Sequence, residues 1–208
     1  QRQMCIRDSV NDSEGKLNFP EELKDGPEMV LRGACVGLQK MTYLPGHGVY
    51  EYPYTPESFP WFYDKEQWIK YLDMLVANRM NSLYLWNGHP FASLVKLEDY
   101  PFALEVDEET FKKNEEMFSF LTEEADKRGI FVIQMFYNII LSKPFAEHYG
   151  LKTQDRNRPI TPLIADYTRK SIAAFIEKYP NVGLLVCLGE AMCTVEDDVE
   201  LSLIHISE

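Results

Sequence analysis

Four short apolar runs constrain the fold of this chain more than any other feature of its sequence. They are Val30–Gly37, Ser82–Asn87, Ile130–Tyr137 and Val182–Leu188. Within each run apolar residues follow one another instead of alternating with polar ones. This pattern is typical of strands that are buried on both faces of a parallel sheet.

The segments between the runs carry the signals of amphipathic helices. Asp64 begins a capping-box pattern, and the apolar residues after it recur at helical spacing. Asp107 caps a second helix that Gly129 ends, and Thr161 followed by Pro162 opens a third. Strands that alternate with helices indicate a parallel sheet with right-handed crossovers.

The predicted fold class is α/β, as the N-terminal half of a (β/α)8 TIM barrel. No glycine-rich phosphate loop follows the first run, which argues against a nucleotide-binding, doubly wound sheet. We expect the barrel to be truncated after about its fourth strand. Half a barrel leaves strand edges and apolar surface open, so we expect the chain to be inactive and poorly soluble by itself.

The two ends of the chain do not continue the kind of sequence found in its interior. Residues 1–9 and 201–208 resemble translated sequencing-adapter read-through, and we interpret both as non-native ends that carry no information on the fold. Residues 10–28 are polar and contain prolines and glycines, as expected of a linker or the tail of a preceding domain. Residues 29–200 are then the first half of a TIM-barrel catalytic domain.

Charge and residue spacing exclude several classes of partner. The formal net charge is −12 at pH 7, which argues against binding to nucleic acid or to an anionic membrane. No apolar stretch approaches the length of a membrane span. The four cysteines follow no CxxC or zinc-like spacing, and no His/Asp/Glu cluster has ligand spacing. We therefore expect neither a metal nor a cofactor.

A glutamate follows the fourth apolar run, at the barrel end where active sites are found. The run ends at Gly189, and Glu190 comes next. A carboxyl group in apolar surroundings can have a raised pKa and act as a proton donor, so Glu190 is the candidate catalytic acid. The alternative is that Glu190 caps the next helix or pairs with a surface cation.

Six residues are candidates for binding a sugar substrate, five of them because they lie at or just after the ends of predicted strands. Arg32 stands on the first strand, where a guanidinium could clamp hydroxyls or a carboxylate, or could form a core ion pair. The asparagines could instead be local turn or capping groups, and His89 could be a satisfied loop histidine. The candidates are Arg32, Trp86, Asn87, His89, Tyr137 and Asn138.

Aromatic residues are concentrated in the long loop expected after the first strand. Sugar rings stack on aromatic faces, and long barrel loops often form binding walls. We expect most of these rings to pack against the barrel and one or two to face the cleft. They are Tyr43, Tyr50, Tyr52, Tyr54, Phe59, Trp61, Phe62 and Tyr63.

Met29–Met192 resembles the catalytic barrel of α-glucuronidases that act on plant-wall glucuronoxylan. In that family a serine-glutamate-glycine step after the fourth strand holds the general acid, and the matching step here is Gly189-Glu190-Ala191. The resemblance implies that Glu190 is the proton donor of an inverting hydrolysis and that Arg32 binds the sugar. The matches, in order, are "LRG" (31–33), "NSLYLWN" (81–87), "RGIFV" (128–132), "SKPF" (142–145), "GLKTQD" (150–155) and "YPNVGLLVCLGEA" (179–191).

A second, more distant resemblance is to the β-N-acetylhexosaminidase barrel. It is carried by the order P-x-x-x-x-R-G at 27–33, followed by "WIKYLDMLVANRMNSLYL". Those enzymes have an aspartate before the catalytic glutamate, and Gly189 stands there in this chain. The second resemblance therefore concerns the architecture only. The missing aspartate argues against substrate-assisted catalysis.

Two functional hypotheses follow from the sequence. The first is a glycoside hydrolase of plant polysaccharide or oligosaccharide side chains, working at a periplasmic or secreted site of a bacterium. The second is a non-catalytic, carbohydrate-binding TIM barrel. Both hypotheses imply a carbohydrate partner, and only the first requires Glu190 to donate a proton.

Overall fold

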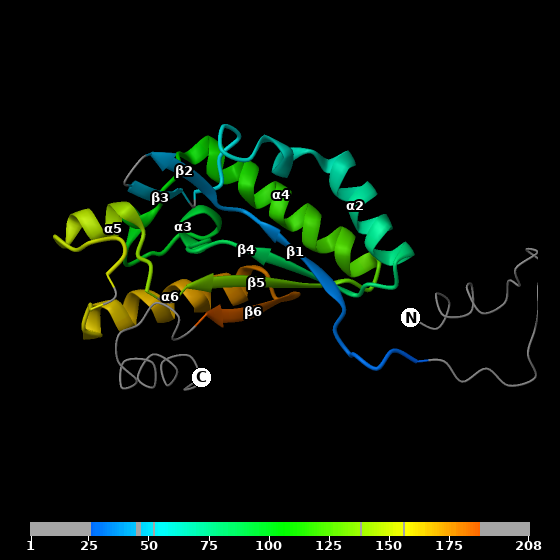
Figure 1. Ribbon diagram of the computed structural model, residues 1–208. Helices are drawn as coiled ribbons and strands as arrows, with labels where there is room; N and C mark the ends of the chain where they lie inside the picture. Colours follow the sequence, from blue (N-terminus) through cyan, green and yellow to red (C-terminus); the bar gives the residue numbers. More distant parts are fainter. Residues whose placement is uncertain (1–25, 45–46, 52, 138, 156, 188–208) are drawn as a thin grey trace, which may run out of the picture.

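The computed structural model describes residues 26–44, 47–51, 53–137, 139–155 and 157–187, which fold around one four-stranded parallel sheet. Its strands are β1 (Gly33–Gly37), β4 (Ser82–Trp86), β5 (Phe131–Tyr137) and β6 (Val182–Cys187). They lie side by side in the order β1-β4-β5-β6 (Figure 1). The four predicted strands and the α/β class are therefore confirmed.

Three long helices connect the strands, as the sequence predicts. They are α2 (Lys65–Ala77), α4 (Glu108–Lys127) and α6 (Pro162–Lys178). Each predicted cap accepts a hydrogen bond from a backbone N–H of the first turn, which satisfies one of the donors that a helix start leaves free. The cap pairs are Asp64 with Gln67 N (2.9 Å), Asp107 with Thr110 N (2.7 Å) and Thr161 with Ile164 N (3.4 Å).

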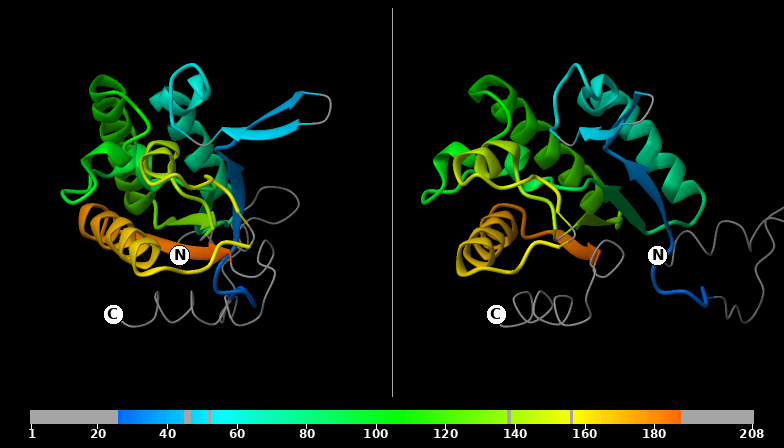
Figure 2. Two further views of the ribbon diagram at one scale, coloured as in Figure 1. Left: turned by 90° about the vertical axis from the view of Figure 1, so that its left-hand side faces the viewer. Right: turned by 60° about the vertical axis from the view of Figure 1, so that its left-hand side comes forward.

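The three helices cover the same face of the sheet (Figures 1 and 2). A sheet whose strands follow in sequence order through right-handed crossovers has its helices on one side. The core lies between the two layers, where alternate strand residues meet the apolar stripes of the helices. Its buried members include Leu72, Leu75, Leu83, Leu85, Phe118, Leu121, Val132, Phe136, Phe175 and Val182.

No helix of the described part of the chain covers the opposite face of the sheet, which we call the open face (Figure 2). Several of its alternate residues are exposed, including Phe131 (47%) and Leu185 (38%), although Ile133 is buried. The expectation that the fourth run is buried on both faces is therefore wrong for the described residues. The helix-facing residues of β6 pack on the core, and the others have no second layer to pack on.

The first strand begins later than predicted, at Gly33 instead of Val30. Met29, Val30 and Leu31 are exposed, and pairing with β4 begins where Gly33 lies opposite Ser82. The two backbones approach so closely there that a Cβ on residue 33 would lie 2.1 Å from the carbonyl oxygen of Ser82. Glycine is thus the residue that fits this position.

Several short elements escape prediction. The segment interpreted as one long loop contains an antiparallel hairpin and a 3-10 helix, and two short α-helices and a second 3-10 helix follow strand ends. These elements are too short for a periodic pattern to develop. They are β2 (Lys40–Leu44), β3 (His47–Glu51), η1 (Pro60–Tyr63), α3 (Phe91–Leu94), η2 (Pro101–Ala103) and α5 (Lys143–His148).

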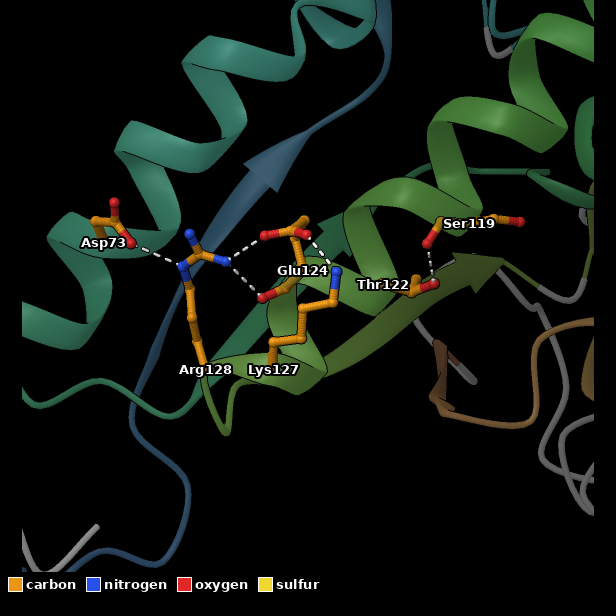
Figure 3. Close-up of polar contacts among 6 residues, drawn as sticks. All are labelled: Asp73, Ser119, Thr122, Glu124, Lys127 and Arg128. Carbon is orange, nitrogen blue, oxygen red and sulfur yellow. Dashed lines mark hydrogen bonds and ion pairs between the residues drawn. The ribbon is translucent and has the colours of Figure 1, made fainter.

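A polar cluster joins the ends of α2 and α4 (Figure 3). Arg128 donates from Nε to Asp73 of α2 at 2.7 Å and from Nη1 to Glu124 of α4 at 2.6 Å. Lys127 also donates to Glu124, at 2.6 Å. The Arg128–Asp73 pair links the two neighbouring helices at the turn that leads into β5, and the two pairs with Glu124 lie within the end of α4.

No helix in the described part of the chain is both long and apolar enough to cross a membrane. The same part of the chain holds no group of three or more His, Cys, Asp or Glu side chains arranged to bind a metal ion.

Candidate functional site

An aromatic pair lies at the carboxyl edge of the sheet, where β4 and β5 end. Trp86 and Tyr137 are in edge-to-face contact, with ring centroids 4.9 Å apart and an interplanar angle of 77°. Both side chains are partly exposed. Trp86 alternates with the core residue Leu85 and Tyr137 with the core residue Phe136, so both belong to the open face. The structure thus brings two of the predicted sugar-binding residues together.

Asn87 follows Trp86 at the end of β4 and is fully buried. Its Nδ2 donates to the carbonyl of Leu38 at 2.6 Å, and its Oδ1 accepts the backbone N–H of His89 at 2.8 Å. The amide therefore ties the chain after β1 to the turn after β4. This is a structural role, and the burial of Asn87 contradicts the prediction that it contacts a sugar directly.

His89 is also buried, at 4% exposure. Its Nε2 is 2.9 Å from the hydroxyl of Tyr167, and the two rings are stacked. Burial lowers the pKa of His89 to about 3, so the ring is neutral at neutral pH. The structure therefore supports the interpretation as a satisfied loop histidine and argues against the predicted direct sugar contact, because the side chain is almost fully buried and its Nε2 already has a partner.

The burial of His89 predicts an acid-sensitive fold. Because the pKa of His89 is lower in the folded protein than in the unfolded chain, the unfolded chain binds more protons. The contribution of neutral His89 to stability is therefore fully present above pH 6.5 and is lost as the pH falls towards 3. We expect a loss of up to about 1.4 kcal/mol per pH unit over this window. His89→Gln should flatten the pH dependence of the thermal midpoint between pH 7 and pH 4.

Tyr167→Phe is the matched control for this prediction. It removes the hydroxyl beside His89 but keeps the titrating ring. We expect it to reduce the free energy of unfolding by about 1 kcal/mol, so that the thermal midpoint is lower at every pH. The pH dependence of the midpoint should remain. Identical pH profiles for the wild type and His89→Gln would show that His89 does not cause the acid sensitivity.

Arg32 lies at the amino edge of the sheet, opposite the aromatic pair. Its side chain donates to backbone carbonyls of Arg79 (Nε, 3.0 Å) and Met29 (Nη1, 2.6 Å). Its backbone N–H donates to Asn81 Oδ1 at 2.8 Å. Arg32 therefore anchors the entry to β1, and the structure does not bring it to the predicted sugar site, because the strand itself separates the two.

Two of the predicted residues, Glu190 and Asn138, lie outside the described residues. The last residue of β6 is Cys187, which is in register with Tyr137 of β5. Glu190 follows Cys187 by three positions in the sequence. Its role as catalytic acid stays a prediction.

The aromatic residues between β1 and α2 pack mainly into the core. Tyr54, Phe59 and Phe62 are buried, and Trp61 and Tyr63 are partly exposed. The Tyr54 hydroxyl donates to Gln134 at 3.5 Å, inside the sheet–helix layer. The expectation that most of these rings pack inward is confirmed for the five that the structure describes. The side chains of Tyr43, Tyr50 and Tyr52 lie outside the described residues.

One titratable group near the carboxyl edge was missed in the sequence. Glu105 precedes α4, and its carboxylate accepts the backbone N–H of Lys143 at the start of α5, at 2.5 Å. Burial raises the pKa of Glu105 to about 7. No local pattern distinguishes Glu105 from the acidic residues that follow it. Its visible contact is structural, because it holds the start of α5.

The comparisons with known proteins include a strong match to a solved structure. A solved GH138 enzyme targeting pectin rhamnogalacturonan II is 82% identical to the chain, with a TM-score of 0.86. The match covers 95% of this chain and 23% of that enzyme, so the chain spans about a quarter of its length. No family model matches the chain, and neither does any curated protein.

Two other solved structures are much less similar. A noncanonic maltogenic α-amylase from Thermotoga neapolitana is 12% identical with a TM-score of 0.42, covering 68% of this chain and 39% of the other. The α-galactosidase from Lactobacillus brevis is 16% identical with a TM-score of 0.39, covering 68% and 21%.

Proposed function

We propose that this chain forms part of a glycoside hydrolase that acts on a plant polysaccharide, with pectin rhamnogalacturonan II as the substrate. The observation that carries the proposal is the 82% identity, over 95% of the chain, with a GH138 enzyme targeting that pectin. Since the chain corresponds to 23% of that enzyme, the activity belongs to a longer polypeptide.

Within that polypeptide, we propose that residues 29–187 supply the first half of a TIM barrel. Three features of the sheet support this. Its strands follow in sequence order, its helices cover one face, and its open face carries apolar side chains. A barrel interior is filled by side chains from all its strands, so the open face is the surface that further strands would enclose.

The proposed chemistry is acid-catalysed hydrolysis at the carboxyl edge of the sheet. Trp86 and Tyr137 hold a sugar ring, and Glu190, which follows the neighbouring strand, protonates the leaving oxygen. The α-glucuronidase resemblance gives the finer form of the proposal, which is release of a uronic acid with inversion. We also propose a periplasmic or secreted location, because pectin is a polymer found outside the bacterial cell.

A hybrid enzyme tests the proposal. Residues 26–200 of this chain replace the matching segment of the similar GH138 enzyme, and the hybrid is incubated with rhamnogalacturonan II. We expect release of a free sugar, which chromatography and mass spectrometry identify. Glucuronic acid would support the finer proposal, and another sugar would replace it. Binding to the pectin without hydrolysis would favour the carbohydrate-binding barrel.

The aromatic pair gives a prediction for the same assay. Trp86→Ala removes the larger ring of the proposed sugar platform, and we expect KM to rise about 5–10-fold with little change in kcat, because binding is lost equally in ground and transition states. Trp61→Leu is the control, since Trp61 packs on the helix-covered face. Equal KM values for Trp86→Ala and the wild type would place the sugar elsewhere.

A further inference from the structure

The chain that follows β5 folds back on itself next to the aromatic pair. Ile140 forms an antiparallel bridge with Gln154, and the backbone N–H of Leu141 donates to the carbonyl of Thr153 at 2.9 Å. Two short segments therefore run side by side immediately after β5, and the chain between them forms α5 (Figure 1). We call these two segments with α5 the β5 loop.

The β5 loop packs directly on Tyr137 of the aromatic pair. Ile139 and Ile140 are each 5% exposed, and Tyr137 packs against the small apolar cluster that they form. Tyr137 also contacts the ring of Trp86, and its backbone N–H donates to the carbonyl of Gly88 at 3.1 Å. The position of the Tyr137 ring therefore depends on the two isoleucines as well as on Trp86.

One arginine joins the two segments of the β5 loop. The guanidinium of Arg158 donates from Nη1 to the carbonyl of Ile139 at 3.2 Å and from Nη2 to the carbonyl of Lys152. The side chain is partly buried, and this burial lowers the pKa of Arg158, although nearby Asp155 acts in the opposite direction. A partly desolvated guanidinium gains more from such hydrogen bonds than a solvated one, so the two contacts hold the segments firmly.

We infer that Arg158 is a positioning residue of the sugar site, which fixes the β5 loop and thereby holds the ring of Tyr137 in place. This role rests on the proposed function, in which Tyr137 is part of the sugar platform. Arg158 acts through Tyr137 and does not itself contact the sugar. Its planar fork bonds two acceptors in a fixed geometry, which a lysine ammonium does not reproduce. The site therefore requires the fork and not only the positive charge.

Hydrogen exchange in the hybrid enzyme tests whether Arg158 holds the loop, and this test does not need hydrolysis. Arg158→Ala should speed amide exchange of Leu141 at least about 10-fold, because the carbonyl of Thr153 is no longer held beside it. Arg158→Lys should also speed it, since it lacks the fork. Mass spectrometry of the peptides that cover residues 139–142 measures the rate. Unchanged exchange in both variants would overturn the inference.

Kinetics on the pectin test whether the loop positions Tyr137. Arg158→Ala and Arg158→Lys should each raise KM about 3–5-fold and change kcat less than about 2-fold, because binding is weakened equally in ground and transition states. In a Tyr137→Ala background, Arg158→Ala should have no further effect on KM, because the residue through which it acts is missing. Arg128→Ala is the control and should leave KM unchanged, since it removes the partly buried arginine that links α2 and α4.

Two kinetic outcomes would overturn the inference. One is an additive rise of KM in the double variant of Arg158 and Tyr137, and the other is a wild-type KM for Arg158→Lys, which would assign the effect to charge alone. Failure of the proposed function has a different signature. If Trp86→Ala and Tyr137→Ala both leave KM unchanged while exchange in Arg158→Ala is faster, the sugar platform is refuted and the role of Arg158 in holding the loop is supported.

Discussion

Glu190→Gln is expected to reduce the hydrolysis of rhamnogalacturonan II by the hybrid enzyme about 10²–10⁴-fold, the range that general-acid catalysis typically contributes. Glutamine keeps the size and hydrogen bonding of the side chain but has no proton to donate. The measurement is kcat/KM for the wild-type hybrid and the variant. The effect should lie in kcat, because the proton is needed in the transition state.

A substrate with a good leaving group provides the control. A nitrophenyl glycoside of the released sugar needs little protonation, so Glu190→Gln should slow its hydrolysis much less than that of the pectin. Equal losses on the two substrates would assign Glu190 a positioning role. Unchanged activity on both would exclude Glu190 as the acid.

Gly33→Ala is expected to have the largest effect on stability, about 3 kcal/mol. The added Cβ would lie 2.1 Å from the Ser82 carbonyl oxygen and 2.4 Å from its Oγ, so β1 must move away from β4. For a domain of this size such a loss lowers the thermal midpoint by about 6–12 °C. Calorimetry of the hybrid enzyme measures the shift.

Gly37→Ala is the matched control, on the same strand and the same face. A Cβ at Gly37 meets no atom within 4 Å. The substitution should change the midpoint little, or raise it slightly because alanine has fewer unfolded conformations to lose. If both alanines had the same effect, the close approach of β1 and β4 would not be what requires glycine at position 33.

The fold was predictable to the extent that it depends on patterns long enough to repeat. Asp64, Asp107 and Thr161 each cap the helix that the sequence assigns to them. The hairpin between β1 and α2 was missed because its strands are five residues each and proline and glycine lie between them. Open apolar surface was expected of half a barrel, but an apolar run does not tell which of its two sides is covered, so the side chains on the open face could not be assigned from the sequence.

The position of the candidate residues at the carboxyl edge was predictable, while sugar binding there stays a prediction. The rule that functional side chains gather where parallel strands end selected Trp86 and Tyr137, which the structure brings into contact. It also selected Asn87 and His89, whose side chains bind the protein itself. Position after a strand tells which edge a residue occupies but not whether its side chain turns outward or into the fold, because the distant partners Leu38 and Tyr167 decide that.

The sequential strand order has a consequence for synthesis on the ribosome. Since β4 pairs with β1, β5 with β4 and β6 with β5, each new strand emerges after the edge on which it docks. Pairing between segments that are distant in the sequence is slow, because the loop between them must first be closed. The nascent chain can therefore extend its sheet one strand at a time without waiting for a segment that is still untranslated.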